Sequence, residues 1–302
     1  MTKSRVDRFA FPLLLLANVA LAFGPLLVRE AGTAGGIGPT ASAFWRLTFA
    51  APMLLVLARL TGEARPSRRL LLPLALAGLF FAADLAAWHA GILRTRLANA
   101  TLLANATGFL FPVYGMLIAR RGPGRMEGAA LTLALAGTVL LLGRSFELSA
   151  DHVVGDLLCV LGGLCFTAYL ITLDRARAGG SPLAELMAAT VAGTPMLLLA
   201  AFAMGEAIWP TTFAPLLLLA FTSQVVGQGI LLLVLRKVSP TLIGLSFLLQ
   251  PAIAAATGWA VYGERLTAVD YAGALVIGVA LVLVRLPERA SPGRRERLDT
   301  GS

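Results

Sequence analysis

Ionisable side chains occur within segments of otherwise apolar sequence. Asp84 is followed one helical turn later by Trp88, with His89 adjacent, and Arg46 lies in an earlier apolar segment. A carboxylate and a guanidinium are costly in hydrocarbon, so both should face a bundle interior or a wet cavity. Two interpretations remain open for Asp84. It gates or lines a cavity, or it forms a buried structural ion pair with Arg46.

Amide and hydroxyl side chains recur at helical spacing in other apolar segments. Gln224 and Gln228 share one helix face, and Ser246 and Gln250 share another. Such groups could bind the carboxylate and ammonium of an amino acid, but the same residue types also hydrogen-bond membrane helices to one another. Aromatic rings beside them could stack on an aromatic ligand. The predicted substrate-binding residues are Asn18, Trp88, His89, Asn105, Tyr169, Gln224, Gln228, Ser246 and Gln250.

Residue patterns for catalysis are sparse. The chain has two histidines, no HExxH and no P-loop, so we expect no catalytic residues, no metal and no cofactor. These absences argue against a membrane-embedded enzyme, which is the first alternative function to consider. A channel is the second, but a channel needs a continuous polar lining. The net charge of +9 does not predict nucleic-acid binding, because the basic residues lie between the apolar segments.

The composition predicts an all-α membrane protein. Hydrophobic residues make up 58% of the 302 and charged residues 14%, against roughly 45–50% and 25% in soluble domains. Apolar runs of about 20 residues are long enough to cross a bilayer as helices. Ten spans are predicted: 9–29, 39–60, 70–93, 97–119, 126–143, 153–173, 183–204, 213–235, 240–262 and 267–285. Gly24-Pro25 predicts a kink in the first of them.

Lys and Arg residues predict the orientation. If the N-terminus is cytoplasmic, 19 of the 25 fall in inside segments, 5 fall outside and Arg46 lies within a span. Cytoplasmic flanks of membrane helices collect positive charge. Both termini and the 61–69 and 120–125 loops are therefore expected in the cytoplasm, which for a bacterial inner-membrane protein leaves the other loops outside.

The two halves of the sequence resemble each other. Pro52 follows Pro39 at the same interval at which Pro195 follows Pro182, and Met-Leu-Leu comes directly after both Pro52 and Pro195. Five helices per repeat is an odd number, so the second repeat must enter the membrane inverted. Two inverted repeats around a central site are typical of alternating access. We expect repeats at 1–145 and 152–287 and a cytoplasmic tail at 288–302.

Two motifs add a family resemblance. Phe44-Trp45-Arg46 resembles the aromatic-Arg signature of the drug/metabolite transporter superfamily, and Tyr262-Gly263-Glu264 followed by Asp270-Tyr271-Ala272-Gly273 resembles its repeat ending. The chain is similar to the ten-helix form with two EamA-type repeats, nearest the bacterial exporters of amino acids, including aromatic ones. The resemblance implies a secondary transporter with a small-molecule substrate and a bilayer as partners, and Asp84 and His89 make the proton a further candidate partner.

Overall fold

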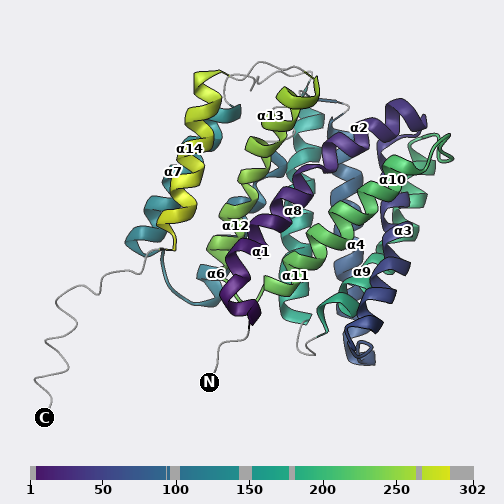
Figure 1. Cartoon of the computed structure of the whole chain (residues 1–302), viewed down its shortest axis with the longest axis horizontal. Helices are drawn as coiled ribbons and strands as arrows, with labels where there is room; N and C mark the ends of the chain where they lie inside the picture. The colour runs from purple at the N-terminus through teal and green to yellow at the C-terminus, as the bar shows by residue number, and fades with distance from the viewer. Residues whose placement is uncertain are drawn as a thin grey trace, which may run out of the picture.

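The computed structural model describes residues 5–92, 94–95, 103–142, 152–176, 181–262 and 267–285. Every regular element in these ranges is helical (Figure 1). The first repeat contains α1 (Arg5–Ala22), α2 (Gly24–Gly35), α3 (Pro39–Leu60), α4 (Arg68–Ile92), α6 (Thr107–Ile118) and α7 (Arg125–Leu142). Residues 288–302 and Glu264, named in the sequence predictions, lie outside the described residues.

The second repeat has the same order of elements. It contains α8 (Val153–Ala176), α9 (Pro182–Ala203), α10 (Ala214–Leu219), the π-helix η2 (Ala220–Gln228), α11 (Gly229–Val234), α12 (Pro240–Phe247), α13 (Leu249–Tyr262) and α14 (Ala268–Leu283). Within the described residues, six helical stretches are long and apolar enough to span a membrane, and three shorter apolar helices accompany them. The all-α, two-repeat fold predicted from the sequence is confirmed.

Breaks within the spans mostly follow residues that weaken helices. The first span is divided between α1 and α2 at Phe23, directly before Gly24 and Pro25, as the sequence predicts. The ninth span is divided at Leu248, where Pro251 has no N–H group to donate to the preceding turn. The eighth span is continuous but contains η2 at its centre, without a proline. The sequence predicts the eighth and ninth spans as plain helices, so neither irregularity was predicted.

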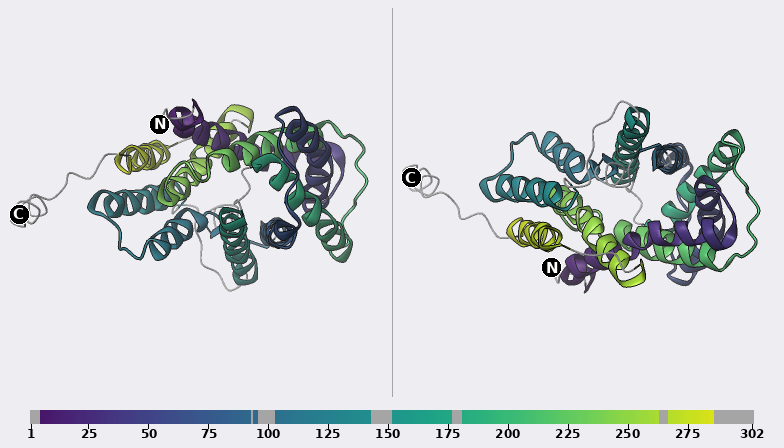
Figure 2. Two further views of the ribbon diagram at one scale, coloured as in Figure 1. Left: turned by 90° about the horizontal axis from the view of Figure 1, so that it is seen from below. Right: turned by 90° about the horizontal axis from the view of Figure 1, so that it is seen from above.

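Packing shows the pseudo-twofold axis. Three helices of the first repeat each pack against their own counterpart in the second: α3 on α9, α6 on α12, and α7 on α14. An element that touches its own symmetry mate must lie beside the axis. Viewed roughly along the helices, α7 and α14 lie side by side at one edge of the molecule (Figure 2). The first turn of α1 and the last turn of α14 lie at the same end (Figure 1).

In each repeat the third span packs mainly on helices of the other repeat. Helix α4 packs on α8 and α9, and its counterpart, the α10–η2–α11 span, packs on α1 and α3. The α4–α9 contact is close because Gly78 and Gly193 face each other there. A Cβ atom added at Gly78 would overlap the Ala189 carbonyl oxygen, and one at Gly193 would lie 2.6 Å from the Gly78 oxygen. The two helices therefore touch backbone to backbone, as small residues permit in membranes.

Candidate functional site

A cavity of about 230 Å³ lies between the repeats. Its walls come from α1, α2 and α3, from the second half of α4, from the segment that leads into α6, from α8 and η2, and from the junction of α12 and α13. Seven of the residues predicted for the site line it: Arg46, Asp84, Trp88, His89, Asn105, Gln228 and Gln250. The sequence thus predicted most of the polar lining, although these residues come from five separate spans.

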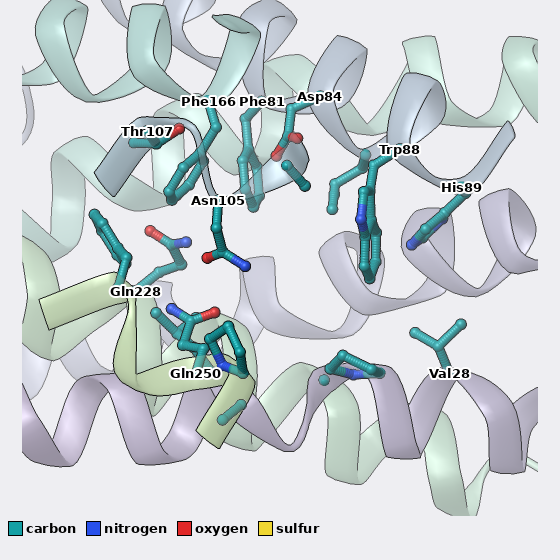
Figure 3. A pocket seen from close by; sticks show the side chains of 18 of the residues that line it. Val28, Phe81, Asp84, Trp88, His89, Asn105, Thr107, Phe166, Gln228 and Gln250 are labelled. Atoms are coloured by element: carbon teal, nitrogen blue, oxygen red, sulfur yellow. The ribbon is translucent and has the colours of Figure 1, made fainter. Parts of the chain in front are cut away.

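The polar groups are divided between two parts of the cavity (Figure 3). The amides of Asn105, Gln228 and Gln250 gather at one end, Asp84 lies between, and Trp88 and His89 lie toward the other end with Val28. The rings of Phe81 and Phe166 lie beside the amides, so hydrogen-bonding and aromatic groups occur together at that end. The cavity thus offers both kinds of contact to a small molecule.

Arg46 is held by an amide. Its Nε and Nη2 groups donate to Gln224 Oε1 at 3.2 and 2.9 Å, and Gln224 Nε2 donates to Thr190 Oγ1 at 3.1 Å. The guanidinium also lies 5.4 Å from the ring centroid of Phe81. Gln224 is fully buried and does not line the cavity, so it orients Arg46 from behind.

Asp84 and Arg46 face the same cavity from adjacent helices. Among the described residues, no salt bridge joins them, because the guanidinium is directed to Gln224. Asp84 is half-buried, and the backbone of Gly162 on α8 approaches it closely. The two ionisable groups thus share one site without forming a close ion pair. That arrangement leaves both able to contact a ligand.

Asn18 and Ser246 join helices behind the cavity. Asn18 Nδ2 donates to Ser246 Oγ at 2.9 Å, and Gln250 Nε2 donates to Asn18 Oδ1 at 3.0 Å. Both Asn18 and Ser246 are fully buried, whereas Gln250 reaches the cavity. The structure therefore separates the predicted amides into a group that lines the cavity and a group that ties α1 to α12 and α13.

Tyr169 also lies behind the cavity wall. Its hydroxyl donates to Gln228 Oε1 at 3.2 Å, and its ring stacks on Phe81 with centroids 4.7 Å apart. It is fully buried. Tyr169 therefore positions an amide and an aromatic ring that do line the cavity.

The apolar walls of the cavity and one hydroxyl group were not predicted from the sequence. Phe81, Thr107, Phe166 and Phe247 line the cavity together with Gly24 and Pro25. Phe166 and Phe247 meet edge to face at 5.4 Å, and Thr107 Oγ1 donates to the Gly163 carbonyl at 2.8 Å. Phenylalanine is common throughout the chain, so no sequence signal distinguishes these three rings from rings that face lipid.

Fold and cavity together define a two-repeat helical membrane protein with a central cavity. The EamA-like transporter family model matches residues 8–143 and again residues 153–286. The chain therefore belongs to the EamA-like transporter family, which makes it a multi-pass membrane transporter.

Named relatives match this chain at low sequence identity. The threonine/homoserine exporter RhtA of Salmonella typhimurium strain LT2 is 26% identical over 191 residues, which cover 63% of this chain and 64% of the relative. RhtA of Escherichia coli strain K12 is 26% identical over 169 residues, covering 56% and 57%. The chain thus matches less than two thirds of the length of these relatives.

A solved crystal structure has the same fold. It superposes with a TM-score of 0.75 at 17% sequence identity, covering 94% of this chain and 99% of that chain. At this identity the similarity concerns the fold alone.

Proposed function

We propose that this transporter exports small amino acids across a bacterial inner membrane by alternating access, with both termini in the cytoplasm. Threonine and homoserine are the first substrates to test, because they are the ones named for the RhtA relatives. The orientation rests on the 19 to 5 distribution of Lys and Arg. The inverted repeats supply the two related halves that such a cycle needs.

One observation carries the substrate proposal. Arg46 and Asp84 line the same cavity and are not joined in a salt bridge within the described residues. A free amino acid carries a carboxylate and an ammonium group, so it complements this pair of charges. The guanidinium would bind the carboxylate and Asp84 the ammonium. A ligand with both charges also avoids leaving either buried group uncompensated.

The rest of the cavity fits a short polar side chain. Asn105, Gln228 and Gln250 offer amide donors and acceptors at one end, where a substrate hydroxyl would hydrogen-bond. A site built to bond a hydroxyl discriminates against an analogue that lacks it, because its own polar groups are then left unpaired. Valine, which has the shape of threonine without the hydroxyl, should therefore bind more weakly. Aromatic amino acids serve as the second comparison, because an aromatic substrate could stack on the rings of Phe81 and Phe166 in the cavity wall.

Transport by purified protein in vesicles tests this assignment. Asp84→Asn and Arg46→Gln each remove one charge, and we expect each to lower the transport of labelled threonine at least tenfold, since a charge-assisted hydrogen bond contributes about 1.5–3 kcal/mol. Glu30→Gln, on α2 outside the cavity lining, is the matched control. Equal transport of threonine by the wild type and both variants would contradict the zwitterion site, and preferential transport of phenylalanine or tryptophan would replace the proposed substrate.

Energy coupling is proposed through protons. Asp84 and His89 are the ionisable groups of the cavity that can change charge during a cycle, and His89 is buried with no hydrogen-bond partner at Nδ1 among the described residues. An uncoupler should then abolish net threonine export in energised vesicles. Exchange of labelled for unlabelled threonine should continue in the presence of the uncoupler. Export unaffected by the uncoupler would favour uniport or exchange.

A further inference from the structure

Helices α3 and α9 end in the same way. After each helix a glycine adopts a left-handed conformation, Gly62 with φ of 71° and Gly205 with φ of 67°. The next residue in each case is a glutamate, Glu63 or Glu206, whose backbone N–H bonds back five residues to a helix carbonyl. This is the Schellman motif, which only glycine enters without strain. The motif therefore fixes the two glutamates in equivalent places of the two repeats.

Each glutamate reaches the first turn of the other helix. Glu206 accepts hydrogen bonds from the backbone N–H groups of Thr40 and Ala41 at 3.2 and 2.7 Å. Glu63 accepts from those of Leu183 and Ala184 at 2.8 and 2.9 Å. Thr40 and Ala41 directly follow the first proline of α3, and Leu183 and Ala184 directly follow that of α9, so the repeat relates the two sets of bonds.

These carboxylates take the place of the missing N-caps. Both helices begin with a proline, Pro39 and Pro182, and neither Gly38 nor Ser181 before them supplies a side-chain cap. The N–H groups of the first turn have no partner within their own helix, and the positive end of the helix dipole lies there. Glu63 and Glu206 satisfy both needs from the opposite repeat. We call these two contacts the clasp.

Both ends of the clasp are closed in a conformation whose cavity is not symmetrical. The cavity is lined by α2 and by the second half of α4, with Val28 and His89 among its residues, and these segments lie toward the Glu206 end. A contact that served as a gate would be made at one end and broken at the other in such a state. Here the bonds at the two ends are equivalent, and α3 and α9 pack against each other between them.

We propose that Glu63 and Glu206 keep α3 and α9 together as one rigid unit throughout the transport cycle, so that the other helices move around this pair. The inference rests on the proposed transport activity, because a transport cycle must exist for the unit to persist through it. In this proposal Gly62-Glu63 and Gly205-Glu206 hold a fixed pivot together and do not act as gates. The pseudo-twofold axis passes between α3 and α9 and exchanges the two closed ends.

Crosslinks at each end test whether the clasp opens. In a background with Cys159→Ala and Cys165→Ala, the pair Thr40→Cys and Met204→Cys bridges the Glu206 end, where Thr40 Oγ1 lies 3.4 Å from Met204 Sδ. Leu183→Cys with Thr61→Cys is the repeat-related pair at the other end. Either pair is closed with a short bifunctional thiol reagent that a reductant cleaves. Both glutamates stay in place.

The crosslinked transporters should keep their rate to within roughly twofold of the reduced forms at both ends. A loss of transport on crosslinking that reduction restores, at either end, would overturn the proposal and make that contact a gate. If the reduced forms do not transport threonine, the proposed function is wrong. The clasp is then tested by the thermal melting experiment below, which does not depend on transport.

Thermal melting supplies that second measurement and needs no substrate. Glu63→Gln and Glu206→Gln should each lower the melting temperature by several degrees, because an amide keeps one acceptor oxygen but loses the charge that both helix ends attract. Melting of both clasp variants at the wild-type temperature would contradict a clasp that holds the two helices.

Discussion

At the scale of single residues, burial separates two kinds of polar group that are alike in sequence. Asn105 and Asn18 are both amides within membrane spans, yet only Asn105 lines the cavity. Asn18 is bonded to Ser246 and Gln250. One asparagine should therefore act on transport and the other on stability.

Asparagine-to-alanine changes make this difference measurable. Asn105→Ala should lower threonine transport roughly 3- to 30-fold, the equivalent of one hydrogen bond. Asn18→Ala should lower the stability by about 0.5–1.5 kcal/mol, since it leaves Ser246 and the Gln250 amide without their partner. Transport rate and melting temperature are measured on the same preparations. The reverse pattern would mean that Asn18 contacts substrate and Asn105 ties helices.

The polar lining could be predicted from residue types because charged and amide side chains in apolar spans are costly in lipid and face the bundle interior or a wet cavity. Arg46, Asp84 and Gln228 all reach the site for that reason. The sequence could not show that Gln224 lies behind Arg46 while Gln228 lines the cavity. They are one turn apart, and they differ in their partners: Gln224 bonds to Arg46 and Thr190, whereas Gln228 accepts from Tyr169. The rings of the cavity wall were missed because apolar residues in this chain face lipid, core and cavity alike.

At the scale of helices, close approach depends on residues without side chains. Gly78 on α4 and Gly193 on α9 let two backbones touch, and neither site has room for a Cβ atom. At Gly278 on α14, a Cβ atom would have nothing within 4 Å of it. The three glycines are thus identical in sequence terms and different in surroundings.

Valine at these positions should reveal the difference. Gly78→Val should force α4 and α9 apart and destabilise the protein by about 1–3 kcal/mol or more, since overpacking of a tight contact costs that much. Gly278→Val should leave the melting temperature within about a degree of the wild type, because a surface change rarely exceeds about 0.5 kcal/mol. Detergent-solubilised samples heated side by side give the comparison. A stable Gly78→Val protein would show that the α4–α9 contact is looser than described.

Helix boundaries followed from composition more closely than helix shape did. The second span was predicted at 39–60 and α3 is observed at Pro39–Leu60, because Gly38 and the charged 61–69 segment flank it on both sides. The π-helix η2 escaped prediction since its sequence, AFTSQVVGQ, has the pattern of an ordinary helix with scattered polar residues. The clasp was also missed, although Gly62-Glu63 and Gly205-Glu206 share the offset of the matched prolines. Two residues in a loop are too weak a signal until the opposite helix end is placed beside them.

At the scale of the molecule, the repeat and the charge distribution together predict how the chain crosses the membrane. The first turn of α1 and the last turn of α14 lie at one end, as an even number of spans requires. The 61–69 loop is at that same end, and the α9–α10 connection is at the other. The domain limits of 1–145 and 152–287 stay predictions, because residues 143–151 lie outside the described part.

Single cysteines decide the orientation. In the background lacking Cys159 and Cys165, Ser67→Cys should react with a membrane-impermeant thiol reagent only after the cells are permeabilised. Ala207→Cys, exposed at the opposite end, should react in intact cells. Labelling of Ser67→Cys in intact cells would invert the topology and, with it, the side of the membrane toward which the cavity lies.

The charged pair in the cavity belongs entirely to one repeat. At the offset that relates Pro39 to Pro182, the counterpart of Arg46 is Ala189 and that of Asp84 is Gly227. Two copies of the first half would therefore place two guanidinium groups and two carboxylates around the axis, and two copies of the second half would place none. A zwitterion can therefore bind in this cavity in only one orientation, whichever side of the membrane the cavity opens to. Affinity can consequently differ between the two faces of the membrane, which changes how fast each half-cycle runs but leaves the final concentration ratio to whatever ion is coupled.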